Sequence, residues 1–120
     1  MAHNTGPSAA VRRAVYERDQ HLCAICGASS PLTLQHRVAR GMGGTRNPAI
    51  NLPGNLLTLC GSGTTGCHGK VEANPSEAQE NGWSVSRYRE PTATPVNTWR
   101  GWMLLDHNGH YHWVPEPATL

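Results

Sequence analysis

The chain has 120 residues, of which 38% are hydrophobic, and it contains 13 glycines, 9 prolines and no phenylalanine. This length fits one domain, and this composition allows few long helices or strands and only a modest apolar core. No apolar segment follows the N-terminus and none approaches the ~20 residues that cross a bilayer, so neither secretion nor membrane spanning is expected. We therefore expect a cytoplasmic protein.

The formal net charge is +2, but it is unevenly distributed along the chain. Residues 1–70 contain seven basic and two acidic side chains, whereas residues 71–120 contain three basic and six acidic ones. A basic half of this kind suits a polyanionic partner such as nucleic acid. Ordinary surface charge explains the asymmetry equally well, so charge alone does not decide the partner.

The N-terminal region is expected to form an arm and a helix. Residues 1–7 are polar, contain glycine and proline and show no periodicity, which predicts a disordered arm. Ser8 can cap a helix over roughly residues 9–20, which carries an apolar stripe. Arg12 and Arg13 lie outside that stripe and can reach a phosphate backbone, although surface solubility explains them nearly as well.

Four cysteines form two pairs, Cys23 with Cys26 and Cys60 with Cys67. A domain with little core usually needs a staple, and four cysteines supply either two disulfides or one metal site. A reducing compartment favours the metal site. Cys-x-x-Cys followed by glycine also makes a tight turn whose two thiolates point the same way, as tetrahedral zinc requires.

A redox pair is the main alternative for the first two cysteines, but it would need a βαβ context that this sequence lacks. We therefore expect one structural zinc ion held by all four thiolates. The second pair departs from the usual spacing of two to four residues, because six residues separate Cys60 from Cys67. That segment is expected to be an enlarged loop of the second knuckle.

The middle of the chain predicts a ββα unit. Residues 32–38 alternate as a strand does, and residues 55–60 form a second apolar strand that ends at a cysteine. A glycine-rich break and a long loop separate the two strands. A helix is then expected from Cys67 to about residue 73, before Pro75.

Five motifs follow one another in this region: Cys23-x-x-Cys26, Gln35-His36, a glycine-rich turn, the run from Asn55 to Cys60, and Cys67-His68. This ordered set, over roughly residues 9–74, resembles the HNH endonuclease family, of the zinc-bearing kind found in bacteriophage genomes. The resemblance implies an α+β class and a small zinc-stapled ββα-metal (His-Me finger) fold. It places the nuclease domain at residues 8–80. Residues 81–120 lie beyond the resemblance and are expected to form a β-rich extension, with a β-hairpin, that packs on the same domain.

The resemblance also assigns catalytic roles. His36 would be the general base, since imidazole titrates near neutral pH, and Asn55 would hold the loop and help to orient that base. His68 would bind a catalytic divalent cation, Mg²⁺ or Mn²⁺ or another, which neutralises charge at the phosphate. We expect the rings of His36 and His68 to face each other across a small cleft. A core histidine is the alternative reading of His36 by itself.

One position departs from the family pattern. Many HNH proteins carry Asp or His as a metal ligand just before the general base, and this chain has Gln35. An amide oxygen is a weaker and uncharged ligand, so either Gln35 binds through its amide or another group compensates. Glu72, one helical turn after His68, is the candidate; the alternative is a solvent-facing carboxylate.

The resemblance implies a DNA endonuclease that nicks DNA or, as a homodimer, cuts both strands. Such a protein would serve phage genome processing or packaging in the host-cell cytoplasm, with a terminase as a candidate partner. No base-reading helix is evident, so backbone contacts should dominate. The basic residues expected to contact DNA are Arg12, Arg13, Arg37, Arg40, Arg46 and Lys70. A zinc-bound nucleic-acid-binding module without catalysis and a purely structural zinc protein are the competing hypotheses.

The C-terminal region is expected to be rich in strands, and residues 90–95 to be a linker. Strands are predicted over residues 83–88, 99–105 and 110–114. The last two flank Asn108-Gly109, a strong hairpin turn. Three histidines in this region lack an evident acidic or cysteine partner and are not expected to bind a metal: His107, His110 and His112.

Overall fold

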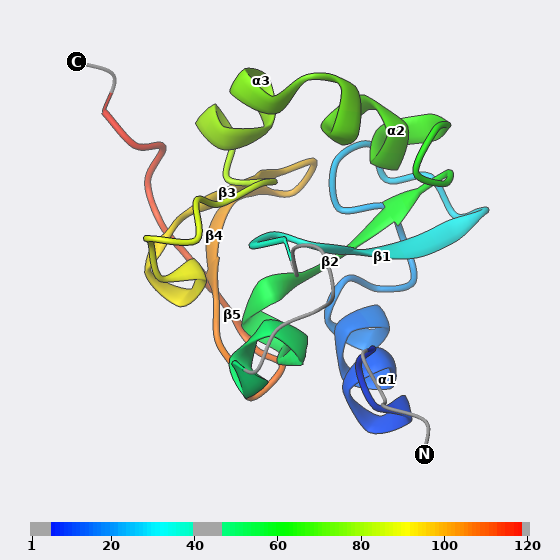
Figure 1. The fold of residues 1–120 in the computed structure, drawn as a ribbon, viewed down its shortest axis with the longest axis horizontal. Helices are drawn as coiled ribbons and strands as arrows, with labels where there is room; N and C mark the ends of the chain where they lie inside the picture. Colours follow the sequence, from blue (N-terminus) through cyan, green and yellow to red (C-terminus); the bar gives the residue numbers. More distant parts are fainter. Residues whose placement is uncertain (1–5, 40–46, 119–120) are drawn as a thin grey trace.

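Two antiparallel sheets and three α-helices make up the described part of the computed structural model, which covers residues 6–39 and 47–118 (Figure 1). The predicted α+β class is therefore confirmed. No helix in these ranges is both long enough and apolar enough to cross a membrane. The helices are α1 (Ala9–Arg18), α2 (Gly66–Ala73) and α3 (Pro75–Glu80), and the strands are β1 (Leu32–His36), β2 (Leu56–Cys60), β3 (Val96–Thr98), β4 (Gly101–Leu105) and β5 (Tyr111–Trp113).

The first sheet is a hairpin of β1 and β2, in which Leu32 pairs with Cys60 and His36 with Leu56. Figure 1 shows α1 on one side of this hairpin and α2 on the other. Both helices contact β2, and leucines on both faces of β2 are buried. Two 3₁₀ turns, η1 (Pro48–Asn51) and η2 (Pro53–Asn55), lead into β2. The two strands and the helix predicted for this region are therefore confirmed.

A buried ion pair joins the end of α1 to β2. Ser8 caps the helix as predicted, because its Oγ accepts a hydrogen bond from Val11 N. At the other end, Arg18 Nε lies 2.9 Å from Asp19 Oδ1, and Arg18 also donates to the carbonyl of Leu56. Asp19 Oδ2 accepts from Thr58 N at 3.0 Å. These contacts fix α1 against the strand that leads to the second cysteine pair.

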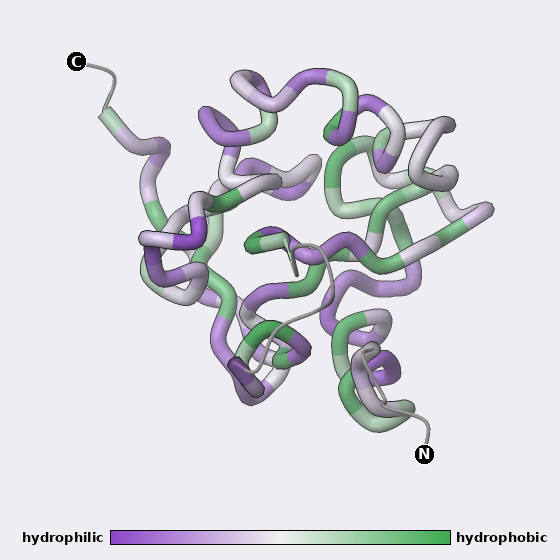
Figure 2. Tube along the Cα trace, viewed as in Figure 1, coloured by the Kyte–Doolittle hydropathy of each residue, from purple (hydrophilic) through white to green (hydrophobic). Residues whose placement is uncertain are grey.

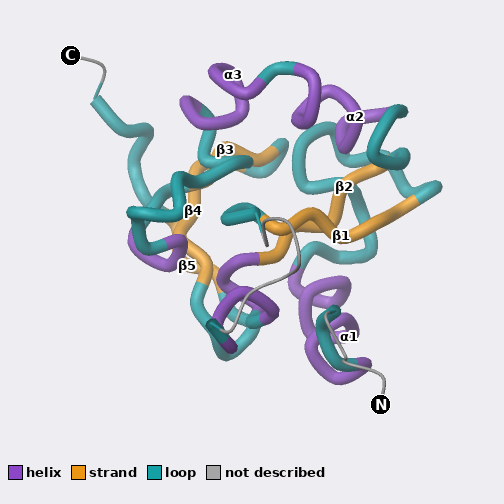
Figure 3. The backbone as a smooth tube through the Cα atoms, in the orientation of Figure 1, coloured by secondary structure: helices purple, strands orange, loops and turns teal. Residues whose placement is uncertain are grey.

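One hydrophobic core serves both sheets. Leu57 and Leu59 of β2 and Val71 of α2 belong to the same buried cluster as Val96 of β3 and Met103 of β4. Figure 3 shows the three-stranded sheet of β3, β4 and β5 lying beside the hairpin, and Figure 2 shows that α3, at the rim, is mostly hydrophilic. The C-terminal region thus packs on the domain that carries the cysteines.

The C-terminal region differs from its prediction in two places. The predicted hairpin is present, since Leu105 of β4 pairs with Tyr111 of β5 around the Asn108-Gly109 turn. The predicted linker contains a 3₁₀ turn, η3 (Pro91–Ala93), and an unpredicted strand, β3, follows it and pairs with β4. The strand predicted over residues 83–88 is wrong, because its backbone turns instead of extending.

The side chain of Arg37 explains that turning segment. Arg37 is only 1% exposed. Its guanidinium donates hydrogen bonds to four backbone carbonyls, those of Gly54, Gly82, Pro91 and Thr94. Burial, together with the charge of Arg18, lowers the pKa of Arg37 to about 9, so the side chain still carries its charge at neutral pH. Arg37 is therefore buried and engaged inside the protein, which places it poorly for the DNA contact predicted from the sequence.

Replacing Arg37 with leucine should destabilise the fold strongly. The four carbonyls would lose their buried donors, and the cost should be at least about 3 kcal/mol in the free energy of unfolding. Urea denaturation of the zinc-loaded protein measures it. Arg37→Lys should be nearly as damaging, because one ammonium cannot reach four acceptors. The exposed Arg13→Ala is the matched control and should change the free energy by less than about 0.5 kcal/mol. A loss below about 1 kcal/mol in Arg37→Leu would contradict this account.

Candidate functional site

The four cysteine thiols meet at one point of the structure. All four are free cysteines that form no disulfide, and their sulfur atoms lie within 4.8 Å of one another. Cys26 Sγ is 3.7 Å from Cys60 Sγ. Four thiolates at about 2.3 Å from a tetrahedral zinc ion are about 3.8 Å apart, so this spacing fits zinc closely. The prediction that the two pairs come together in one cluster is confirmed, and this cluster could hold a zinc ion.

Each knuckle also stabilises its own thiolate. The backbone N–H of Cys26 donates to Cys23 Sγ at 3.5 Å, and that of Cys67 donates to Cys60 Sγ at 3.4 Å. Burial and the charge of Cys23 raise the pKa of the Cys67 thiol well above its ordinary value. Four adjacent thiols cannot all ionise unless a cation offsets their repulsion, so a bound metal ion would stabilise the thiolate form of this cluster.

Backbone turns bring together the two knuckles, which are residues 23–26 and 60–67. Gly27 closes the first knuckle with a positive φ of 80°, and Gly61 begins the second with a φ of 87°. A Cβ on Gly61 would lie 2.1 Å from Thr65 O, so only glycine fits there. The first knuckle is tied to β2 and to the turn between β3 and β4, because Ala24 N donates to Thr58 O and Ala24 O accepts from Trp99 N.

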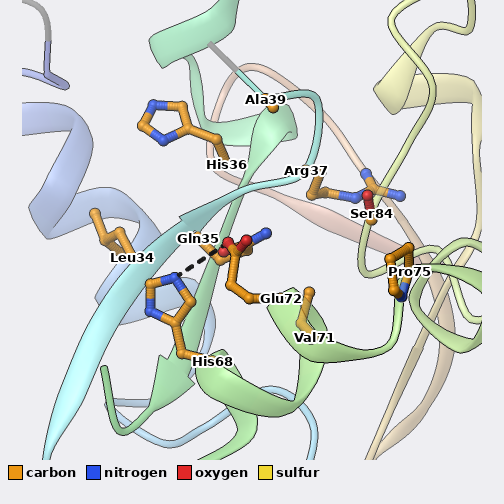
Figure 4. A pocket seen from close by; sticks show the side chains of 10 residues that line it. All are labelled: Leu34, Gln35, His36, Arg37, Ala39, His68, Val71, Glu72, Pro75 and Ser84. Atoms are coloured by element: carbon orange, nitrogen blue, oxygen red, sulfur yellow. Dashed lines mark ion pairs between the residues drawn. The ribbon is translucent and has the colours of Figure 1, made fainter. Parts of the chain in front are cut away.

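A cleft of about 380 Å³ lies between β1 and the helices α2 and α3 (Figure 4). It contains most of the residues that the sequence assigned to catalysis. Its polar lining residues are Gln35, His36, Arg37, His68, Glu72 and Ser84. Figure 4 shows Gln35, His68 and Glu72 pointing toward one another within it.

Thr33 fixes the orientation of the His68 ring. His68 Nδ1 lies 2.7 Å from Thr33 Oγ1, and that hydroxyl lies 3.3 Å from Leu59 O and 3.2 Å from Gly61 O. A hydroxyl that donates to one of these carbonyls must accept from Nδ1–H. His68 Nε2 then keeps its lone pair and faces the cleft, the usual arrangement of a histidine that binds a metal.

Glu72 and Gln35 complete the group around His68. Glu72 Oε1 lies 3.9 Å from His68 Nε2, which makes an ion pair if the ring is protonated and a pair of adjacent cation ligands if it is neutral. Gln35 is 7% exposed, and within residues 6–39 and 47–118 no hydrogen bond is formed by its side-chain amide. Its amide atoms are open to the cleft, so they are available to a ligand there.

His36 lies on the opposite side of β1 from Gln35 (Figure 4). Consecutive strand residues point to opposite faces, so Thr33 and Gln35 face α2 and His36 does not. The rings of His36 and His68 therefore do not face each other, contrary to the sequence-based expectation, although both residues line the same cleft. His36 Nε2 donates to Asn51 Oδ1 at 2.7 Å, which fixes the ring.

Asn55 holds the two ends of the long loop, as its proposed role requires. It is 1% exposed, and its Oδ1 accepts from Val38 N at 2.8 Å. Its Nδ2 donates to Val38 O at 3.1 Å and to Ile50 O at 2.9 Å. Asn55 thus acts within the protein, where it sets the backbone that follows His36.

The basic residues predicted to contact DNA occupy different positions. Arg12 and Arg13 are exposed on α1, on the far side of the hairpin from α2 (Figure 1). Lys70 lies 3.4 Å from Glu77 and 5.9 Å from the centre of the Trp83 ring, so its charge is partly engaged. The remaining two, Arg40 and Arg46, lie outside the described residues.

The histidines of the C-terminal hairpin have a carboxylate partner that the sequence did not reveal. Asp106 Oδ2 lies 2.8 Å from His112 Nε2 and 3.7 Å from His110 Nδ1. Burial opposes ionisation of Asp106, but hydrogen bonds from His112 and from backbone N–H groups lower its pKa to about 2. His107 is part of the scaffold instead, since its Nδ1 accepts from Gly54 N.

Comparison of this chain with protein-family models, with curated proteins and with solved structures gives no match in any of the three. The function therefore rests on the residues of the site. Two of its residues, Thr33 and Asn51, were not predicted. The signal for Thr33 was its place two residues before Gln35 on the same strand face, whereas Asn51 carries no local signal.

Removing zinc should lower the thermal stability of the protein. At a zinc concentration a thousandfold above Kd, binding contributes about 4 kcal/mol, which corresponds to roughly 15 °C in Tm for a domain of this size. Calorimetry before and after chelation measures the difference. Cys67→Ser should reproduce the loss and should also lower the zinc content below one ion per chain. Zinc bound at full stoichiometry by Cys67→Ser would contradict a four-thiolate site.

Proposed function

We propose that this chain is a metal-dependent DNA endonuclease of the HNH type, with a ββα-metal fold and a structural zinc ion. The observation that carries the proposal is the convergence of Gln35, His68 and Glu72 in one cleft, with His36 as the next residue of the same strand. These residues supply a cation site and a base within reach of one phosphodiester.

The cation would be held by His68 and Glu72, with the Gln35 amide as a third ligand. His68 offers an oriented Nε2, Glu72 a carboxylate oxygen and Gln35 an unpartnered amide. Imidazole and oxygen ligands together accept Mn²⁺ and other divalent transition ions, and carboxylate oxygens accept Mg²⁺. When bound, such an ion neutralises charge on the phosphate and on the leaving 3′ oxygen.

His36 would act as the general base. Its Nε2 lies 2.7 Å from Asn51 Oδ1, an oxygen that can only accept, so Nε2 carries a proton and Nδ1 would be the nitrogen that takes a proton from water. Gln35 and His36 leave β1 on opposite sides, so a phosphodiester that crosses the end of this strand meets the cation ligands on one side and the base on the other. Asn55 fixes the backbone on which this arrangement depends.

The proposed substrate is DNA, bound mainly through its backbone. A single copy would nick one strand, and a homodimer would cut both. By the resemblance stated above, the chain would serve phage genome processing or packaging in the cytoplasm of an infected cell, with a terminase as partner. The second candidate is a zinc-bound nucleic-acid-binding module without catalysis, which the uncharged Gln35 favours.

His36→Ala should separate these two functions. A nuclease that loses its base should cleave supercoiled plasmid at least about 100-fold more slowly, since general base catalysis typically contributes 10²–10⁴-fold. Its DNA affinity and zinc content should not change. The assay compares wild type and variant with Mg²⁺, Mn²⁺, Ni²⁺ and Zn²⁺. Wild-type protein that binds DNA but is inert with each of these ions would favour the binding module.

Glu72→Gln should weaken the cation site. Loss of the carboxylate should raise the Mn²⁺ concentration that gives half-maximal cleavage by roughly 10- to 100-fold, the usual cost of altering a metal site. Thr33→Val should also raise this Mn²⁺ concentration, but by a smaller factor, because it removes the hydroxyl that orients the His68 ring. Glu77→Gln, also acidic and exposed but outside the cleft, is the matched control. An unchanged Mn²⁺ dependence in Glu72→Gln would exclude Glu72 as a ligand.

A further inference from the structure

We infer that the turn formed by Ser86, Arg87, Tyr88 and Arg89 binds an unpaired nucleotide of the DNA strand beside the cleft. This segment lies beyond the residues that resemble the endonuclease family, and its basic residues are absent from the predicted DNA contacts. The inference rests on the proposed function only for the position of the scissile bond. We name this segment the Arg87–Arg89 turn.

Hydrogen bonds hold the Arg87–Arg89 turn in one conformation. Arg89 N donates to Ser86 O at 2.9 Å, which closes a four-residue turn, and Tyr88 N donates to Ser86 Oγ at 3.3 Å. Val85, just before the turn, is 6% exposed and belongs to the buried apolar residues. The tip is therefore a rigid projection, which costs little conformational entropy when it binds a ligand.

The turn is anchored directly to Arg37, the residue that follows β1. Val85 N donates to the carbonyl of Arg37 at 2.8 Å, one residue beyond His36. The Arg37 side chain holds the same segment at both ends, through Gly82 O at 2.9 Å and Thr94 O at 2.7 Å. The position of the turn relative to the proposed general base is thus set by the core.

Adjoining cavities run from the catalytic cleft to the turn. Ser84 lines both the catalytic cleft and a second cavity of about 280 Å³, which Arg89 also lines. Arg89 and Arg87 then line a third cavity, of about 140 Å³, together with Val38 and Asn55. Figure 4 shows Ser84 at the wall of the catalytic cleft. A strand with its scissile phosphate in the cleft could continue along this path.

The side chains of the turn match a nucleotide in chemistry. Tyr88 is 82% exposed, and the Arg87 guanidinium lies 5.0 Å from the centre of its ring and donates to its hydroxyl at 2.8 Å. One face of an exposed ring therefore carries a cation, and an unpaired base can stack on the other face.

The arginines of the turn are available for phosphates. In the described chain, neither Arg87 nor Arg89 forms an ion pair with a carboxylate. Glu80 lines the same cavity as Arg89, and the neighbouring Glu90 accepts hydrogen bonds from Thr92 instead. Glu90 also lines the third cavity but pairs with neither arginine. Two cations without a carboxylate partner beside an exposed aromatic ring are the usual elements of a site for single-stranded DNA.

The test is DNA binding by the zinc-loaded full chain without any other divalent cation, so that the probe is not cut. Fluorescence anisotropy with a labelled dT12 strand and with a 12-base-pair duplex gives both affinities. Tyr88→Ala should weaken binding of dT12 by about 5- to 100-fold, the range for one lost base–aromatic stack, and should change duplex affinity by less than about twofold. Arg87→Gln combined with Arg89→Gln should reduce the salt slope for dT12 by about 1.4.

Matched variants keep the test specific to the turn. Tyr88→Phe retains the ring and should bind dT12 as wild type does. Trp113→Ala removes another exposed aromatic ring, 55% exposed on β5, and should also leave dT12 binding unchanged. Thermal unfolding of each variant confirms that it is folded before its affinity is compared.

The outcomes separate this inference from the nuclease proposal. If Tyr88→Ala and Trp113→Ala bind dT12 equally well, or if wild type has no affinity for dT12, the inference is overturned even when plasmid is cleaved. If Tyr88→Ala loses dT12 binding while wild type cleaves nothing, the inference holds and the nuclease proposal fails.

Discussion

The guanidinium of Arg37 connects the parts of this domain that the sequence keeps apart. It donates to carbonyls of η2, of the segment after α3 and of the segment around η3, while its own backbone carbonyl accepts from Val85 N. A buried charge is costly unless its donors find acceptors, and four of the five N–H groups of Arg37 do, so this residue tolerates few alternative arrangements of those loops. The residue after the proposed general base is thus the centre of the C-terminal packing.

The thiol cluster complements Arg37 at the other end of the hairpin. Arg37 fixes the loops around the end of β1, whereas the cysteines join the turn after α1, the end of β2 and the start of α2. A domain with no phenylalanine and few long elements gains from such point constraints, because each removes conformational freedom that a modest core cannot offset. The proposed cation site lies between these two anchors and is held from both sides.

The placement of Gln35 and His36 on opposite faces of β1 changes how the proposed chemistry is understood. Two rings facing each other across a cleft would enclose a water molecule between them. Instead, the proposed cation ligands and the proposed base lie on either side of a strand end, so the proposed substrate would have to cross that end. The surface beyond β1, including the Arg87–Arg89 turn, would then be part of the path of the bound strand.

Local pattern in the sequence determined most of the elements and the cysteine cluster. Alternation and apolar runs predicted β1, β2 and the C-terminal hairpin, Ser8 predicted the start of α1, and the paired cysteines predicted the thiol cluster, because each of these features depends on neighbouring residues. Only the tertiary structure decided the rest. From the sequence, Arg37 resembled a surface cation. In the structure it donates to four carbonyls, which belong to segments up to 57 residues away. In the same way, the direction of His36, the role of Thr33 and the short strand β3 depend on partners distant in the chain, and such partners leave no local pattern to read.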